Sequence, residues 1–122
     1  MDKYTLRRQL KAARNALTPA ERRHAARAAL RQALRQGLLL RARRIAFYLP
    51  QGGEFDVHPL LDQALCMHLE CYLPVLPRRG RVMRFGRVGH ATRMKPNRYG
   101  IPEPGDAKPL RAHQLDLLLM PL

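Results

Sequence analysis

Apolar residues recur every three to four positions over the first third of the chain. Over residues 2–16 they share the helical surface with basic residues, which predicts an amphipathic helix. A second helix is expected to begin at Thr18-Pro19, because a hydroxyl, a proline and then Glu21 form an N-terminal capping sequence. It is expected to end near Gly37, where a residue without Cβ can adopt left-handed geometry. Two helices are therefore predicted before any strand.

Beyond residue 44 the pattern changes to short, nearly continuous apolar runs, which are typical of buried strands. Residues 45–49 form the first run, and Pro50 ends it. A stretch with helical spacing and Pro59 in its first turn predicts a third helix. Further strands are expected over residues 71–76, 82–85 and 115–120. A strand, a helix and a strand in this order predict a right-handed βαβ unit, and with it an α/β fold built on an open, mostly parallel sheet with flanking helices.

Residues 89–114 break this alternation, because prolines and glycines interrupt them throughout. We expect a long ordered loop here rather than a regular element. Loops of this length in compact domains are often functional.

The chain has 122 residues, of which 46% are hydrophobic, so it can form one core and one domain over residues 1–122. No apolar run has the length of a membrane span or of a secretory signal, and we expect a soluble, cytoplasmic monomer. Cys66 and Cys71 are most simply small core residues. The five histidines are scattered, so neither a metal ligand set nor a nucleophile is predicted, and the catalytic residues stay unassigned.

The formal net charge is +14, and residues 1–44 hold 13 basic residues against 2 acidic ones. Such a charge favours polyanionic partners. Arginines line much of the second predicted helix, but no aromatic residue lies between them. We therefore expect weak, salt-sensitive binding of polyanions and no specific recognition of nucleic acid. A basic nucleic-acid-binding module remains the alternative.

In open α/β sheets the ligand crevice lies beyond the carboxyl ends of the strands, so residues 50–56 are the first place to look for a site. The glycines at 52 and 53 permit close backbone approach, and Glu54 and Asp56 could accept hydrogen bonds from a heterocycle that carries amino groups. Alternatively, Asp56 caps the following helix and Glu54 favours its dipole, and spacing alone favours this reading. Lys3 and Arg7 lie one helical turn apart and could hold a polyphosphate, although most such pairs are solvated.

Four short segments carry a resemblance to a known family. They are Lys3–Arg7, Ala46–Pro50 leading to Glu54–Asp56, Gly100–Pro104, and Asp116–Pro121. Together and in this order, they resemble the N-terminal part of the 5-formyltetrahydrofolate cyclo-ligases, also called methenyltetrahydrofolate synthetases.

The resemblance implies an enzyme that uses ATP and Mg²⁺ to close 5-formyltetrahydrofolate to 5,10-methenyltetrahydrofolate, releasing ADP and phosphate. By the matching motifs, five residues of the first helix would contact ATP: Lys3, Tyr4, Thr5, Leu6 and Arg7. Five residues would contact the folate: Arg7, Gln51, Glu54, Asp56 and Tyr99.

Family members continue past the segment that 116–121 resembles into a glycine-rich loop that holds the triphosphate. This sequence ends before such a loop. We therefore expect a truncated cyclo-ligase-like domain from which the C-terminal part of the family fold is missing. An inactive remnant of the enzyme is a further alternative.

Overall fold

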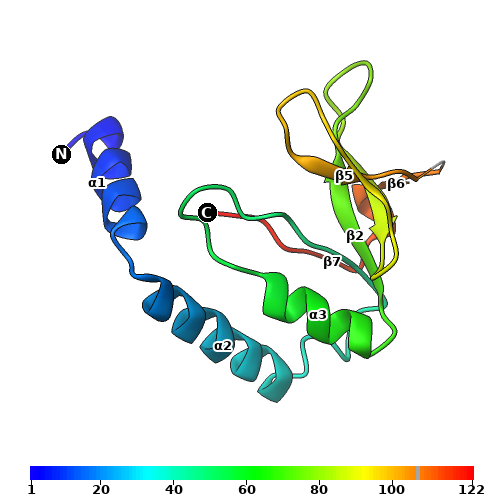
Figure 1. Ribbon diagram of the computed structural model, residues 1–122, viewed down its shortest axis with the longest axis horizontal. Helices are drawn as coiled ribbons and strands as arrows, with labels where there is room; N and C mark the ends of the chain where they lie inside the picture. Colours follow the sequence, from blue (N-terminus) through cyan, green and yellow to red (C-terminus); the bar gives the residue numbers. More distant parts are fainter. Residues whose placement is uncertain (107) are drawn as a thin grey trace.

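The computed structural model describes residues 1–106 and 108–122, and it begins with the two expected helices, α1 (Lys3–Asn15) and α2 (Pro19–Arg35) (Figure 1). Asp2 caps α1, because its side chain accepts a hydrogen bond from the backbone N–H of Thr5 at 2.7 Å. At the start of α2 the Thr18 hydroxyl and the Glu21 carboxylate each accept a bond from the other residue's N–H, which confirms the predicted capping box. Gly37, just beyond α2, has φ 67°.

Helix α1 lies to one side of the sheet, and all of its side chains are at least partly exposed (Figure 1). Its hydrogen bonds to later parts of the described chain lie at its C-terminal end. The Arg14 carbonyl accepts a bond from Arg22 Nη2 at 2.8 Å, and Arg14 Nη1 donates to the Leu122 carbonyl at 3.0 Å. Asn15 packs against Gly53, where a Cβ would collide with the asparagine side chain. The apolar side of this amphipathic helix is open to solvent, and Leu10 is 61% exposed.

The main sheet is mixed, with the strand order β6-β3-β2-β1-β7. Its strands are β1 (Arg44–Ala46), β2 (Glu70–Val75), β3 (Arg84–Val88), β6 (Leu110–Arg111) and β7 (Leu117–Leu118). β1 is parallel to β2 and β7, whereas β3 is antiparallel to β2 and β6. Helix α3 (His58–Cys66) connects the parallel strands β1 and β2, as the predicted βαβ unit requires. The α/β fold with two helices before the first strand is confirmed.

The prediction of a loop without regular structure over residues 89–114 is wrong for the described part of that range; residue 107 lies outside the described residues. Two strands, β4 (Met94–Pro96) and β5 (Pro102–Pro104), form an antiparallel ribbon, and β6 and a 3₁₀ helix, η1 (Ala112–Gln114), follow. Prolines normally argue against strands because they lack an N–H donor, but an edge position does not need that donor. Both strands of a two-stranded ribbon are edges.

The observed strands begin or end a few residues away from the predicted positions. β1 ends at Ala46 rather than at residue 49, although the N–H of Phe47 still donates to the Tyr72 carbonyl at 2.8 Å. β3 begins at Arg84 and continues to Val88, and β7 is limited to Leu117–Leu118.

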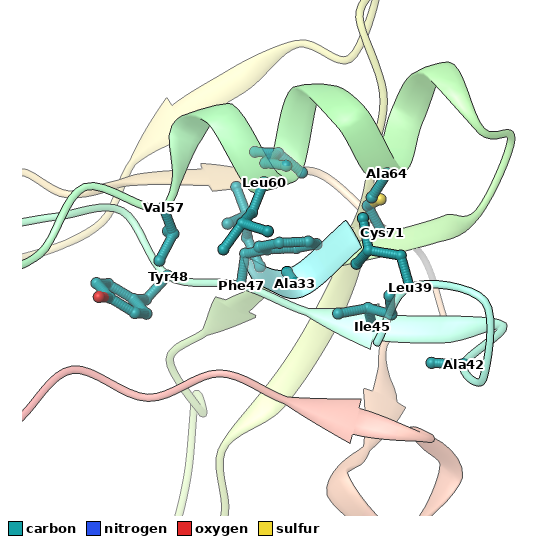
Figure 2. Close-up of a cluster of buried hydrophobic side chains, with 12 residues drawn as sticks. Ala33, Leu39, Ala42, Ile45, Phe47, Tyr48, Val57, Leu60, Ala64 and Cys71 are labelled. Atoms are coloured by element: carbon teal, nitrogen blue, oxygen red, sulfur yellow. The ribbon is translucent and has the colours of Figure 1, made fainter. Parts of the chain in front are cut away.

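The core lies between α3 and the parallel half of the sheet (Figure 2). Leu60 and Ala64 of α3 face Ile45 and Phe47, which are completely buried. Cys71 is buried beside Ala64, and burial raises the pKa of its thiol to about 11, so this cysteine is a core residue as predicted. Cys66 is exposed, which contradicts the prediction for it. It follows Ala64 by two positions and therefore points away from the core.

In the part of the chain that the structure describes, no helix combines the length and apolar character that crossing a bilayer requires.

Candidate ligand-binding pocket

A pocket of about 250 Å³ lies beyond the carboxyl ends of β1 and β2, where the topology predicts a ligand crevice. Most of its wall comes from the residues that follow β1, the end of β2 and the β4–β5 hairpin, with Met83 before β3 and Pro121 after β7. The wall residues are mostly apolar, among them Leu49, Leu73, Met83 and Ile101. Polar groups come from Gln51, Glu54, Asn97 and Glu103. Apolar walls with a few polar groups are the usual lining of a small-molecule site.

The turn after β1 holds two of the predicted folate contacts, Gln51 and Glu54, in the pocket wall. The Glu54 carboxylate accepts a hydrogen bond from the backbone N–H of Gln51 at 2.8 Å, and the Glu54 N–H donates to the Gln51 carbonyl at 3.2 Å. Gly52, between them, has φ 57°, a left-handed conformation that favours glycine. The Glu54 carboxylate is thus fixed by its own turn before any ligand arrives.

Tyr48 forms part of the pocket wall and also braces the segment that follows the turn. Its hydroxyl donates to the Phe55 carbonyl at 2.9 Å. Burial raises the pKa of the Tyr48 phenol, and the negative charges of Glu54 and Asp56 raise it further, whereas Arg14 opposes the rise. The phenol therefore stays protonated and keeps its donor role at neutral pH.

On the opposite wall, Glu103 and Asn97 connect the β4–β5 ribbon to the main sheet. Glu103 Oε2 accepts hydrogen bonds from the Leu76 N–H at 2.8 Å and from Asn97 Nδ2 at 3.0 Å. Asn97 Oδ1 in turn accepts from the N–H groups of Tyr99 and Ile101. Sequence reasoning missed both roles. Asn97 three positions before Gly100 is a turn signal that could have indicated a hairpin.

Asp56 comes close to the capping role that spacing alone favoured, but it lies one residue before the N-cap of α3, Val57, which makes no side-chain capping bond. Asp56 Oδ1 accepts a hydrogen bond from the His58 N–H at 3.0 Å and lies 2.7 Å from His58 Nδ1. It is not among the residues that form the pocket wall. Its carboxylate therefore orders the start of α3, and its predicted contact with folate stays a prediction.

Tyr99 lies at the exposed end of the β4–β5 ribbon rather than in the pocket wall. The Arg98 guanidinium stands over its ring, 5.3 Å from the centroid. The neighbouring residues Asn97 and Ile101 do form part of the wall. An aromatic surface is thus present at the rim, and its role as a folate contact stays a prediction.

The predicted ATP contacts, Lys3 to Arg7, occupy the first turns of α1. Except for Thr5, these side chains are exposed. The end of the helix that carries them lies away from the sheet (Figure 1). Their role in binding phosphate stays a prediction.

A chain of the α/β class with a pocket at the carboxyl ends of its parallel strands has the architecture of a small-molecule-binding protein. Comparison with known families makes this more specific. The chain belongs to the 5-formyltetrahydrofolate cyclo-ligase family, whose sequence model matches residues 1–122. No curated protein sequence matches it.

Among the solved structures that share the fold are two 5,10-methenyltetrahydrofolate synthetases. The 5,10-methenyltetrahydrofolate synthetase of Aquifex aeolicus superposes with a TM-score of 0.81 at 24% identity, over 97% of this chain and 59% of that one. The 5,10-methenyltetrahydrofolate synthetase of Mycoplasma pneumoniae gives a TM-score of 0.64 at 21% identity, over 100% of this chain and 65% of that one. This chain therefore spans about six-tenths of the length of these two proteins.

Proposed function

We propose that the protein takes part in the ATP-dependent cyclisation of 5-formyltetrahydrofolate to 5,10-methenyltetrahydrofolate, with release of ADP and phosphate. Family membership over residues 1–122 supports the reaction class. The observation that carries the proposal for this chain is the pocket after β1, where Gln51 and Glu54 are presented among apolar walls. A reduced pterin joins a planar pyrimidine ring with amino and amide groups to a puckered apolar ring, and it matches that combination.

The reaction has to make a formyl amide electrophilic. Transfer of the terminal phosphoryl group of ATP to the formyl oxygen turns that oxygen into a leaving group and releases ADP. The N10 amine of the folate then attacks the activated carbon and loses its proton, while the C–O bond breaks and phosphate leaves, so that N10 is bonded to the former formyl carbon. Both steps depend mainly on positioning and on neutralising phosphate charge.

Within this proposal, the fixed Glu54 carboxylate accepts hydrogen bonds from the amino groups of the pterin, and Gln51 supplies amide donors and acceptors beside it. The Glu54 side chain is already held by the Gln51 N–H, so little freedom is lost when the ligand binds. Apolar residues on both sides of the pocket exclude water from the ring.

For ATP, the proposal keeps Lys3 and Arg7 as phosphate contacts near the N-terminus of α1, where backbone N–H groups add positive potential. The helix must then lie closer to the pocket when the ligands are bound. Among the described residues no group of three or more His, Cys, Asp or Glu side chains could hold a metal ion. Mg²⁺ that arrives on the nucleotide phosphates needs only one or two protein carboxylates.

Direct titration of the 122-residue chain with 5-formyltetrahydrofolate tests the proposal. We expect saturable binding that Glu54→Gln weakens about tenfold, because a carboxylate hydrogen bond contributes roughly 1.5–3 kcal/mol. Asp62→Asn, on the exposed side of α3, is the matched control and should leave the affinity unchanged. Absence of saturable binding, or equal effects of the two substitutions, would overturn the assignment of this pocket.

A further inference from the structure

A second and larger cavity, of about 790 Å³, adjoins the pocket after β1 and has a very different lining. The two share Leu76 and Glu103 as walls. The cavity, here called the arginine groove, lies between the β2–β3 connection, β3, the β4–β5 ribbon and β6. Six cationic side chains line it: Arg78, Arg79, Arg81, Arg84, Lys95 and Arg111.

Two of these cations are placed side by side by the sheet itself. Arg84 of β3 is the direct cross-strand partner of Arg111 of β6. Like charges directly opposite each other on antiparallel strands destabilise the pair unless something neutralises them. Arg84 is also half-buried, which limits how far water can screen its charge.

The acidic side chains in the groove are engaged elsewhere. Glu103 accepts hydrogen bonds from the Leu76 N–H and from Asn97. Asp106 accepts from the N–H groups of Arg87 and Lys108, each at 2.9 Å. Across the described residues, the ion pairs of this protein involve Arg44, Arg87 and His58, and none of the six groove cations. The groove lining therefore sets six cations against two carboxylates, Glu103 and Asp106, and keeps a concentrated excess of positive charge.

We infer that the arginine groove binds a small polyanion that carries two or more closely spaced phosphate or carboxylate groups. Guanidinium groups bind both kinds of oxyanion through paired N–H donors, and cations from several walls can hold neighbouring anionic groups at once. This site is separate from the phosphate contacts proposed for Lys3 and Arg7, because α1 contributes nothing to the groove. The inference does not depend on the proposed cyclisation.

The test must separate this site from the general attraction of a chain with net charge +14. Arg78→Gln/Arg81→Gln removes two exposed cations from the groove. Arg23→Gln/Arg31→Gln removes two exposed cations from α2 and lowers the net charge equally. Titrations at constant ionic strength with tripolyphosphate and with tetraglutamate then compare each double variant with the unmodified chain.

We expect at least one of the two probes to bind, and the groove variant to weaken it about tenfold, while the α2 variant changes it less than twofold. The probe that binds more tightly identifies phosphate or carboxylate as the natural anion. Arg111→Gln, on another wall of the groove, should also weaken binding of the probe. This variant tests the site even if the double variant folds poorly.

Three results would overturn the inference. The groove and α2 variants could weaken binding equally, which indicates a diffuse charge effect. Lys3→Gln/Arg7→Gln could abolish binding of the short probes, which would place them at α1. A single-stranded oligonucleotide could bind while both short probes fail, which would make the surface a nucleic-acid interface.

Discussion

Glu103 of β5 accepts a 2.8 Å hydrogen bond from the backbone N–H of Leu76, just beyond the end of β2. This bond joins the β4–β5 ribbon to the main sheet at the wall between the pocket and the arginine groove. Glu103→Ala should destabilise the protein by about 1–3 kcal/mol, because it leaves the partly buried Leu76 N–H and Asn97 amide without an acceptor. Urea unfolding measures this change. Glu103→Gln retains an acceptor oxygen and should cost less, and equal losses for the two variants would contradict the role of the bond.

Phe47 tests the core between β1 and α3. Its side chain is 0% exposed and packs beneath Leu60. Phe47→Ala should lower the free energy of unfolding by about 3–5 kcal/mol, since it removes buried contacts and leaves a cavity. For a domain of this size such a loss can unfold the chain at 37 °C, so the measurement belongs at low temperature.

Leu40→Ala is the control for Phe47, because the Leu40 side chain is 78% exposed. It should change the free energy of unfolding by no more than about 0.5 kcal/mol. Similar losses for both variants would mean that the cluster around Phe47 is not the main core.

The carboxyl group of Glu70 makes the stability of the protein depend on pH. A side-chain hydrogen bond from Arg44, at 2.9 Å, is the main cause that holds the pKa of the Glu70 carboxyl below its ordinary value, and Tyr72 and Arg87 add to it. A carboxyl with a lowered pKa in the folded state stabilises the protein above its unfolded pKa, and that contribution is lost as the pH falls through the folded pKa. The midpoint of urea unfolding should therefore decrease as the pH falls below about 4.5.

Glu70→Gln should remove part of this decrease, so that its unfolding midpoint differs less between neutral and acidic pH. Asp116 contributes in the same direction, because the N–H groups of Arg43 and Arg44 lower the pKa of its carboxyl. The unfolding midpoint of Glu70→Gln should therefore still decrease somewhat at acidic pH. A decrease as large as that of the unmodified protein would show that the Arg44–Glu70 pair does not contribute to the pH dependence of stability.

Tyr48 tests whether the pocket wall is pre-ordered. Tyr48→Phe removes the donor to the Phe55 carbonyl but keeps the ring in the wall. We expect a loss of about 0.5–1.5 kcal/mol in stability and weaker binding of 5-formyltetrahydrofolate, because residues 50–56 are less constrained. Tyr4→Phe, on the exposed face of α1, should change the stability by much less. A Tyr48→Phe protein with unaltered folate affinity would show that this hydrogen bond does not order the pocket.

Features set by neighbouring residues could be predicted from the sequence. The capping box at Thr18 and Glu21 involves residues three positions apart, and the apolar run at Ile45 signals a buried strand by composition alone. The β4–β5 ribbon could not be predicted in this way, because Met94 pairs with Pro104 across ten positions and prolines hide the strand signal.

The candidate site likewise combines features that neighbouring residues predict with features that depend on distant parts of the chain. Gln51 and Glu54 reach the pocket because a short turn places them there. Asp56 has the right residue type for a ligand contact, yet its carboxylate is taken by the adjacent His58. The position of Lys3 and Arg7 relative to the pocket depends on how α1 is oriented, which no local pattern encodes.

Helix α1 is attached to the rest of the protein at its C-terminal end, so a small rotation there moves its N-terminal end over a much larger distance. The helix has 13 residues, and at about 1.5 Å rise per residue it is about 20 Å long. A rotation of about 20° at the junction with α2 would therefore move Lys3 by about 7 Å without breaking any bond inside the helix. The reach of the predicted phosphate contacts thus depends on the junction residues 16–18 and on the bonds of Arg14 to Arg22 and Leu122, far from the side chains that would touch the phosphate.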